Sequence, residues 1–472
     1  MTHKNKKWLP ALIIIGILIS AAVISFTFLR GSRIDAVFLI VVDTLRADRL
    51  SCYGYKNHTT PNIDHLASLG VKFENARAVS SWTRPSMGAM LTSSYPLQLG
   101  LVETFEPTDR QFECHEKRDQ IYSGIPAYKR TWAEILASHS FHTCGFINQP
   151  SLNCLNGFER GFMEYYYPFG PESEIRKLKK EELYENQRWA TTRDGVKNDR
   201  ALAKAFEKWL SKNSQKKLFV WLQFLAPHRP YNPPKEFRRP LSKKSPHDRT
   251  FLYDGEVLAS DQTIGRVLDA INKHVGLERS IIVFVSDHGE NLWDHGCMKR
   301  GHGQSLHREI IHVPLIIVSP NLPKNVSVKN FVRTIDILPT VLEDLDLLSA
   351  APGFEGVSLL PFVQKQQTDL TVYSEGMLYG NSQRSLIDKG LKIIFDQQQK
   401  KYRLYDIKND PNEKFDISKK RAAKTKRMIK KLSKYYIELY REFLAKKNSF
   451  DIDETRRQLD RKALQTLGYI DD

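Results

Sequence analysis

Four short apolar runs, separated by longer amphipathic segments, are the clearest pattern along the chain. These runs cover residues 36–42, 218–225, 281–286 and 313–319, and none contains a charged residue. Apolar runs of this length are typical of strands that are buried on both faces of a sheet. Segments with apolar residues at helical spacing lie between them, for example residues 60–70, 131–139 and 199–212. Strands that alternate with helices predict an α/β fold with a mostly parallel central sheet flanked by helices.

The pattern changes after about residue 350. Residues 390–407 form two apolar stretches around a polar turn, which predicts a small antiparallel C-terminal subdomain. From Ser418 onward the chain is basic and has helical spacing. We therefore expect a main domain over residues 34–350, a small subdomain over residues 351–417, and a basic helical tail over residues 418–472.

The amino-terminal segment contains the longest apolar stretch. Residues 8–29 are 22 residues without a charge, which is long enough to cross a bilayer as a helix. Lysines at positions 4, 6 and 7 favour a cytoplasmic amino terminus, although Arg30 and Arg33 follow the stretch and weaken this orientation. A clear cleavage motif is missing, so residues 1–33 are predicted to be a cytoplasmic stub and a transmembrane signal-anchor. The protein would then be a single-pass membrane protein with its main domain on the extracytoplasmic side. A cleaved signal peptide is the alternative, and it would leave the domain in the same compartment.

The net charge of +17 raises the question of a nucleic-acid partner. Residues 418–447 carry twelve Lys and Arg against two Glu, so this segment alone accounts for +10 of that charge. No zinc-finger spacing or aromatic RNA-binding motif accompanies it, and we therefore expect no nucleic-acid partner. The five cysteines form no CxxC motif, which argues against a metal cluster or a thioredoxin-like site.

Polar residues follow three of the predicted strands at their carboxyl ends. Asp43 follows the first run, His228 lies just beyond the second, and Asp287 and His288 follow the third. In open α/β sheets, ligands bind beyond the carboxyl ends of the strands. Two carboxylates and an imidazole are suitable ligands for a divalent cation. The sequence therefore predicts a metal site made by Asp43, Asp287 and His288.

Thr83 stands directly before a predicted helix. Pro85 fits the first turn of that helix, whose free backbone N–H groups and positive end would face an anionic ester. A nearby cation would lower the pKa of the hydroxyl and make it a nucleophile. The alternative is that Thr83 is a helix cap without chemistry.

Ordered motifs over residues 35–417 resemble the sulfatase family of the alkaline phosphatase superfamily. They include "VVDTLRADRLSCYG", "WTRPSMGAMLTSSYP", "PHRPYNPP", "VFVSDHGE", "GHGQSLHREIIHVPLII" and "LYDIKNDPNE". The resemblance implies an alkaline-phosphatase-like fold with a sulfatase-like catalytic domain. It also implies that Asp43, Asp287 and His288 are metal ligands and that His228 contacts the substrate. His302, in "GHG", matches the residue that contacts the ester and assists the leaving group.

The chain departs from the family pattern at the position of the nucleophile. Thr83 stands where sulfatases have the Cys or Ser that is oxidised to formylglycine, and a secondary alcohol cannot become that aldehyde. Thr44 stands where many sulfatases have a further metal carboxylate, and Met87 replaces an Arg that supports the aldehyde hydrate. Arg84 either supplies that missing cation or points to solvent. These changes resemble phosphoryl-transferring relatives with a Thr nucleophile. The second ligand set of two-zinc phosphodiesterases is not evident, so we expect one divalent ion, with Ca, Mn and Zn left open.

These observations predict a membrane-anchored, metal-dependent hydrolase of sulfate or phosphate esters. Thr83 would be its nucleophile and would also contact the metal. Its substrate would be a sulfated or phosphorylated ester, including a glycan or a lipid. Two alternatives stay open. One is a phosphoryl-group transferase that modifies a cell-surface glycan or lipid, and the other is an inactive, membrane-tethered binding homologue.

Overall fold

The structure is a computed structural model, and it describes eleven segments of the chain. They are residues 34–101, 124–152, 156–169, 174–177, 195–238, 250–296, 301–303, 305–350, 353–365, 367–376 and 382–446. The predicted transmembrane segment lies outside the described residues. Within the described segments, no helix combines the length and the apolar character that a membrane span requires.

Nine strands among the described residues form one large mixed sheet. In spatial order they are β5 (Glu174–Lys177), β4 (Glu164–Phe169), β3 (His142–Ile147), β6 (Leu218–Phe224), β1 (Ala36–Val42), β7 (Ser280–Val285), β8 (Leu315–Val318), β2 (Val71–Arg77) and β9 (Val326–Arg333). The neighbours from β4 to β7 pair in parallel, as do β2 and β9. The strands β5 and β8 run antiparallel to their neighbours. The predicted mostly parallel sheet is therefore confirmed.

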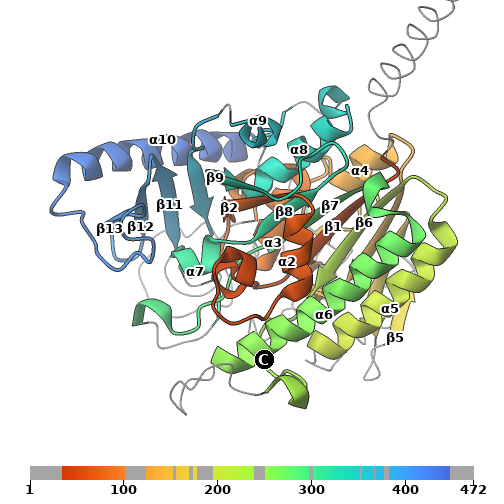
Figure 1. The fold of residues 1–472 in the computed structure, drawn as a ribbon. Helices are drawn as coiled ribbons and strands as arrows, with labels where there is room; N and C mark the ends of the chain where they lie inside the picture. Colours follow the sequence, from red (N-terminus) through yellow and green to blue (C-terminus); the bar gives the residue numbers. More distant parts are fainter. Residues whose placement is uncertain are drawn as a thin grey trace, which may run out of the picture.

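Helices cover both faces of this sheet because side chains alternate along its strands. In β1, Val37, Leu39 and Val41 pack in one core, while Phe38 and Ile40 pack in a second core on the opposite face. The first core contains residues of α3 (Thr83–Thr92), α4 (Trp132–Ala137) and α8 (Ile337–Asp344). The second contains residues of α2 (Pro61–Ser68), α5 (Gly195–Asn213) and α6 (Thr250–His274), and Figure 1 shows the two layers.

The pairing of β1 decides where the functional residues lie. β1 sits between β6 and β7, and all three strands run in the same direction. Val42 pairs with Phe224, and Val41 pairs with Val285, so the three strands end at the same level. The polar residues that follow these strands therefore meet at one edge of the sheet.

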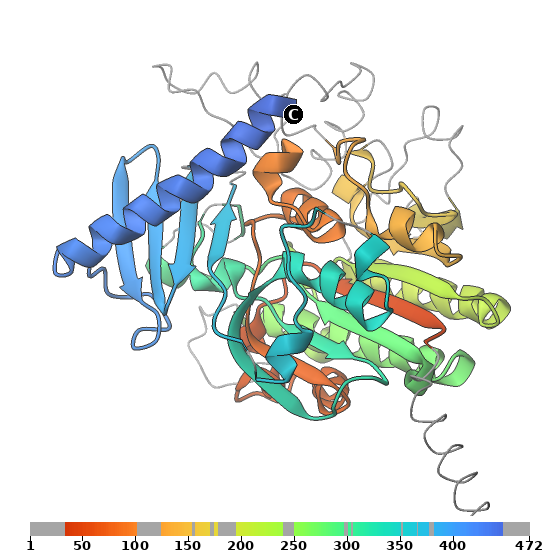
Figure 2. The same ribbon diagram turned by 90° about the horizontal axis from the view of Figure 1, so that it is seen from above.

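A second, smaller sheet forms the C-terminal part of the described chain. Its strands are β10 (Val372–Glu375), β11 (Gln383–Asp388), β12 (Leu391–Asp396) and β13 (Lys401–Asp406), all antiparallel. This confirms the predicted antiparallel subdomain. The basic segment forms α10 (Ala422–Lys446), which lies across the small sheet in Figure 2. Its apolar residues share one core with the sheet, including Met428, Leu432, Leu439 and Phe443.

Candidate active site

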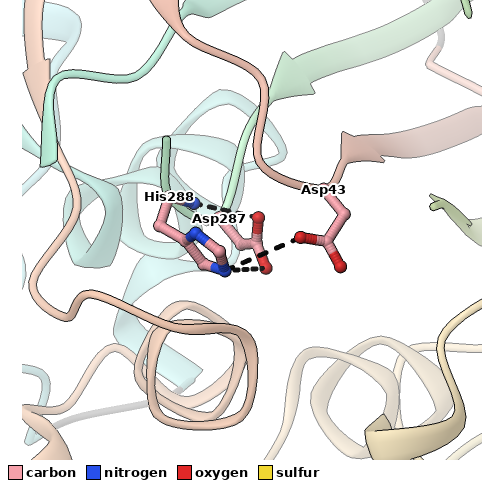
Figure 3. Close-up of side chains that lie close together, drawn as sticks. All are labelled: Asp43, Asp287 and His288. Carbon is pink, nitrogen blue, oxygen red and sulfur yellow. Dashed lines mark hydrogen bonds and ion pairs between the residues drawn. The ribbon is translucent and has the colours of Figure 1, made fainter. Parts of the chain in front are cut away.

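Asp43, Asp287 and His288 converge at the carboxyl ends of β1 and β7. His288 Nε2 lies 3.6 Å from Asp43 Oδ1 and 3.5 Å from Asp287 Oδ2, and Figure 3 shows the three side chains pointing toward one another. One ligand atom from each residue lies within 4.8 Å of the others, and all three residues are buried. Among the described residues, these three side chains are close enough together to bind one metal ion.

The hydrogen bonds of these residues fit a cation between them. His288 Nδ1 lies 2.9 Å from the carbonyl oxygen of Gly289, which places the ring proton on Nδ1 and turns the Nε2 lone pair toward the carboxylates. Asp43 Oδ1 and Asp287 Oδ2 are buried and have no hydrogen-bond partner among the described residues. A lone pair and two partnerless carboxylate oxygens repel one another unless a positive ion lies between them.

Burial also disfavours the ionised form of both carboxylates when no cation is bound. The pKa of Asp43 is raised well above its ordinary value by burial and by the charge of Asp287. Burial also raises the pKa of Asp287, against the effect of His288. Two buried carboxylates that resist ionisation together are expected where a divalent ion is to be held. The donor set of two carboxylates and one imidazole fits such an ion, and it leaves the identity of the metal open.

Thr83 joins this group from the start of α3. Its Oγ1 lies 3.4 Å from Asp43 Oδ2 and 3.2 Å from His288 Nε2, and the residue is fully buried. The helix begins at Thr83 itself, with Trp82 at the N-cap position, and the Thr83 hydroxyl makes no cap hydrogen bond. The interpretation of Thr83 as a helix cap is therefore wrong, because its hydroxyl contacts the metal-site residues instead of the helix backbone.

His228 and His302 lie beside the metal-site residues. The ring centroids of His228 and His302 are 5.0 Å apart, and those of His288 and His302 are 4.4 Å apart. Burial and the neighbouring His302 lower the pKa of His228 to about 3. Burial, His288 and Arg229 lower the pKa of His302 well below its ordinary value. Burial thus favours the neutral form of both rings.

Three further residues at this edge were missed in the sequence. Glu290 Oε1 lies 3.1 Å from His302 Nδ1, and Gln149 Nε2 donates to Asp43 Oδ2. Arg229 lies near His302. A Cβ built on Gly301, the residue directly before His302, would be 3.3 Å from Arg229 Cζ. Arg229 directly follows His228, and Glu290 lies two residues after His288. Gln149 comes just after β3 and obeys the same strand-end rule, but the β3 sequence "HTCGFI" is too mixed to stand out as a strand.

The structure describes the three residues at which the chain departs from the family pattern or could compensate for it, Met87, Arg84 and Thr44. Met87 is buried in the apolar core on one face of the large sheet. Arg84 is also fully buried, and its Nε donates to the Ser151 carbonyl oxygen at 3.2 Å, so the prediction of a solvent-facing Arg84 is wrong. Thr44 has a left-handed backbone with φ of 56°, and its buried Oγ1 has no hydrogen-bond partner within the described part of the chain.

Two family models match the chain. The sulfatase model matches residues 35–347, which include the predicted metal, nucleophile and histidine positions. The model for the C-terminal part of N-sulphoglucosamine sulphohydrolase matches residues 302–442, which include the small sheet and most of α10.

Individual proteins agree with these matches. An arylsulfatase of Clostridium perfringens is 23% identical, over 80% of this chain and 89% of the relative. The structure of Ps i-CgsB in complex with k-i-k-neocarrahexaose superimposes with a TM-score of 0.64 at 22% identity, and covers 92% of this chain and 99% of that one. The phosphonate monoester hydrolase of Agrobacterium radiobacter superimposes with a TM-score of 0.65 at 18% identity, over 87% of this chain and 96% of that one. The chain therefore belongs to the sulfatase family of sulfuric ester hydrolases.

Proposed function

We propose that this sulfatase-family enzyme cleaves sulfate or phosphate esters through a covalent ester on Thr83. The observation that carries the proposal is the position of Thr83 Oγ1, 3.4 Å from Asp43 Oδ2 and 3.2 Å from His288 Nε2. Asp43, Asp287 and His288 would hold the divalent cation. When bound, such a cation lowers the pKa of a neighbouring hydroxyl and offsets the negative charge of the ester.

The reaction balances with one hydroxyl and one water. Thr83 Oγ1 forms a bond to the sulfur or phosphorus atom, and the bond from that atom to the leaving oxygen breaks. The proton released by Thr83 is the one that the leaving oxygen needs to depart as an alcohol. Water then cleaves the Thr83 ester and restores the hydroxyl. Transfer to a second alcohol instead of water would make the same site a transferase.

His302 is the residue that we assign to proton transfer at the leaving oxygen. Its Nδ1 lies 3.1 Å from Glu290 Oε1, so the carboxylate orients the ring, and proton exchange with the ester falls to Nε2. An incoming anion favours the protonated ring, which offsets the desolvation that keeps the free enzyme's histidines neutral. His228 is close enough to share this task, and Arg229 contributes a positive charge beside His302.

We also propose a class of substrates. The complex of Ps i-CgsB with neocarrahexaose supports testing sulfated oligosaccharides. The likeness to a phosphonate monoester hydrolase, together with a threonine hydroxyl as the nucleophile, supports testing phosphate and phosphonate esters. We also propose that residues 8–29 anchor the enzyme in a membrane with the catalytic domain on the extracytoplasmic side, because this stretch carries no charge over 22 residues.

The test is Thr83→Ala in the purified, metal-loaded protein, with aryl sulfate, phosphate and phosphonate substrates. Turnover should be lost while the fold is retained, because the change removes only the hydroxyl and one methyl group. Thr92→Ala is the matched control, since Thr92 lies at the other end of α3 and its hydroxyl donates to the Gly88 carbonyl oxygen. Mass spectrometry of quenched wild type should find the sulfo or phospho group on Thr83. Normal turnover by Thr83→Ala would exclude Thr83 as the nucleophile.

A further inference from the structure

A short helix, α7 (Arg308–Ile311), connects the active site to the C-terminal subdomain. Its backbone carbonyls hold the chain directly after the metal-site pair Asp287 and His288. Gly289 N donates to the Ile310 carbonyl oxygen at 2.6 Å, and Glu290 N donates to the Glu309 carbonyl oxygen at 3.1 Å. The approach is so close that a Cβ on Gly289 would collide with the Glu309 carbonyl oxygen. Any shift of α7 is therefore passed on to the active-site backbone.

α7 also holds the segment that leads to Thr83. Ala78 N, just after β2, donates to the Ile311 carbonyl oxygen at 2.8 Å. The segment after the metal-site pair and the segment after β2, which leads to Thr83, are thus held by the same four-residue helix.

Glu413 holds the start of α7 from the other side. This residue follows β13 and is 3% exposed. Its Oε2 accepts a hydrogen bond from Arg308 N at 3.2 Å and lies 3.0 Å from His307 Nδ1. Both of its carboxylate oxygens accept from Lys392 Nζ, at 2.7 and 2.9 Å, and Lys392 on β12 is fully buried.

A second set of contacts ties the loop after the metal-site pair to the same position. His295 Nδ1 lies 3.0 Å from Glu309 Oε1, and His295 Nε2 lies 3.2 Å from the Glu413 carbonyl oxygen. The rings of His295 and His307 stack with centroids 4.0 Å apart. The segment that holds Glu290 and His295 is therefore anchored to the Glu413 segment through side chains as well as through α7.

We propose that Glu413 is a positioning residue, through which the C-terminal subdomain sets the geometry of the active site. A buried ion pair such as Glu413 with Lys392 adds little net stability over apolar residues, because both charges are desolvated. Its directional hydrogen bonds instead define one register between the small sheet and α7. The catalytic consequence of this proposal rests on the function proposed above, but its structural consequence does not.

Two double variants isolate the hydrogen bonds from the charges. Lys392→Met removes the buried ammonium in both, so neither leaves a charge without its partner. With Glu413→Gln, the amide oxygen still accepts from Arg308 N. With Glu413→Ala, that acceptor is gone, and the start of α7 loses its anchor.

The readouts are hydrogen exchange of peptides covering residues 286–296 and kcat/KM on the best substrate. The Glu413→Ala, Lys392→Met protein should exchange the Gly289 and Glu290 amides faster, and its kcat/KM should fall by about 10–100-fold. The loss should lie mainly in kcat, because the reacting groups are misplaced while the substrate still binds. The Glu413→Gln, Lys392→Met protein should stay close to wild type in both measurements.

Leu404→Ala is the matched control for general loosening of the subdomain. Leu404 on β13 packs in the core shared with α10, on the face of the small sheet away from Lys392 and Tyr405. If Leu404→Ala speeds the same amides equally, or if the Glu413→Ala double variant leaves them unchanged, the proposal is overturned. If the amides respond as expected but wild type cleaves no ester, the positioning inference stands and the proposed function fails.

Discussion

The effect of Asp287→Asn on the free energy of unfolding should depend on whether a metal ion is bound. Asp287→Asn replaces one of two buried carboxylates with a neutral group of the same shape. The amide oxygen can still accept from Thr44 N and His288 N, as Asp287 Oδ1 does at 3.4 and 2.9 Å. The amide nitrogen would take the place of Oδ2, which lies 3.5 Å from His288 Nε2, and can donate to it. The substitution therefore removes a repulsion and adds a donor when no cation is present.

The magnitude follows from the separation of the carboxylates. The ligand atoms of Asp43 and Asp287 lie within 4.8 Å of each other. When both carboxylates are ionised, at a pH above the raised pKa of Asp43, two unit charges at that distance repel by about 3.5 kcal/mol at an effective dielectric constant of about 20. We expect metal-free Asp287→Asn to gain up to about 3 kcal/mol in free energy of unfolding. Metal at about 100 times its Kd stabilises wild type by about 2.7 kcal/mol, and the variant should lose that gain.

The assay is denaturant unfolding of both proteins in chelator and then with Ca²⁺, Mn²⁺ or Zn²⁺. Asp261→Asn is the control, since Asp261 is buried outside the site and accepts from Ile63 N at 2.9 Å. It should destabilise the protein by a similar amount with and without metal. If metal-free Asp287→Asn is destabilised as Asp261→Asn is, the carboxylates do not repel, and the reasoning about the cation is wrong.

Three further predictions rest on the structure and a fourth rests on the amino-terminal sequence. Thr83→Ser should keep part of the turnover, measured as initial rates, because the hydroxyl returns; complete loss would show that the methyl group, too, is needed to place Oγ1. His302→Gln should slow alkyl esters by about 10²–10⁴-fold and 4-nitrophenyl esters much less, since only a poor leaving group needs its proton; equal losses would exclude that role. Burial alone would raise the pKa of Glu413, but Lys392 and His307 lower it to about 2. The free energy of unfolding of wild type should therefore fall as the pH drops from about 4.5 toward 2, and that of the Glu413→Gln, Lys392→Met protein should fall less, in urea unfolding at each pH; parallel pH profiles would contradict this. Membrane fractionation should find the full-length protein in the membrane, and a soluble form lacking the apolar segment would favour the signal-peptide alternative.

Local signals in the sequence were sufficient for the centre of the site. β1 and β7 are continuous apolar runs, and a run of that kind marks both a buried strand and its carboxyl end. Asp43, Asp287 and His288 directly follow those ends, so the strand-end rule was enough to bring them together. The antiparallel C-terminal subdomain was predicted in the same way, from two apolar stretches around a polar turn.

Contacts between distant segments were decided only by the tertiary structure. The sequence contains nothing that links Glu290 to His302 or Glu413 to α7, because both pairings depend on how separate elements pack. The same is true of Thr83, whose position before a proline is equally typical of a helix cap. Its hydroxyl contacts Asp43 because the packing brings the start of α3 to the residue that follows β1. Side-chain identity and local spacing therefore determined which chemistry the chain carries, while packing determined which groups orient it.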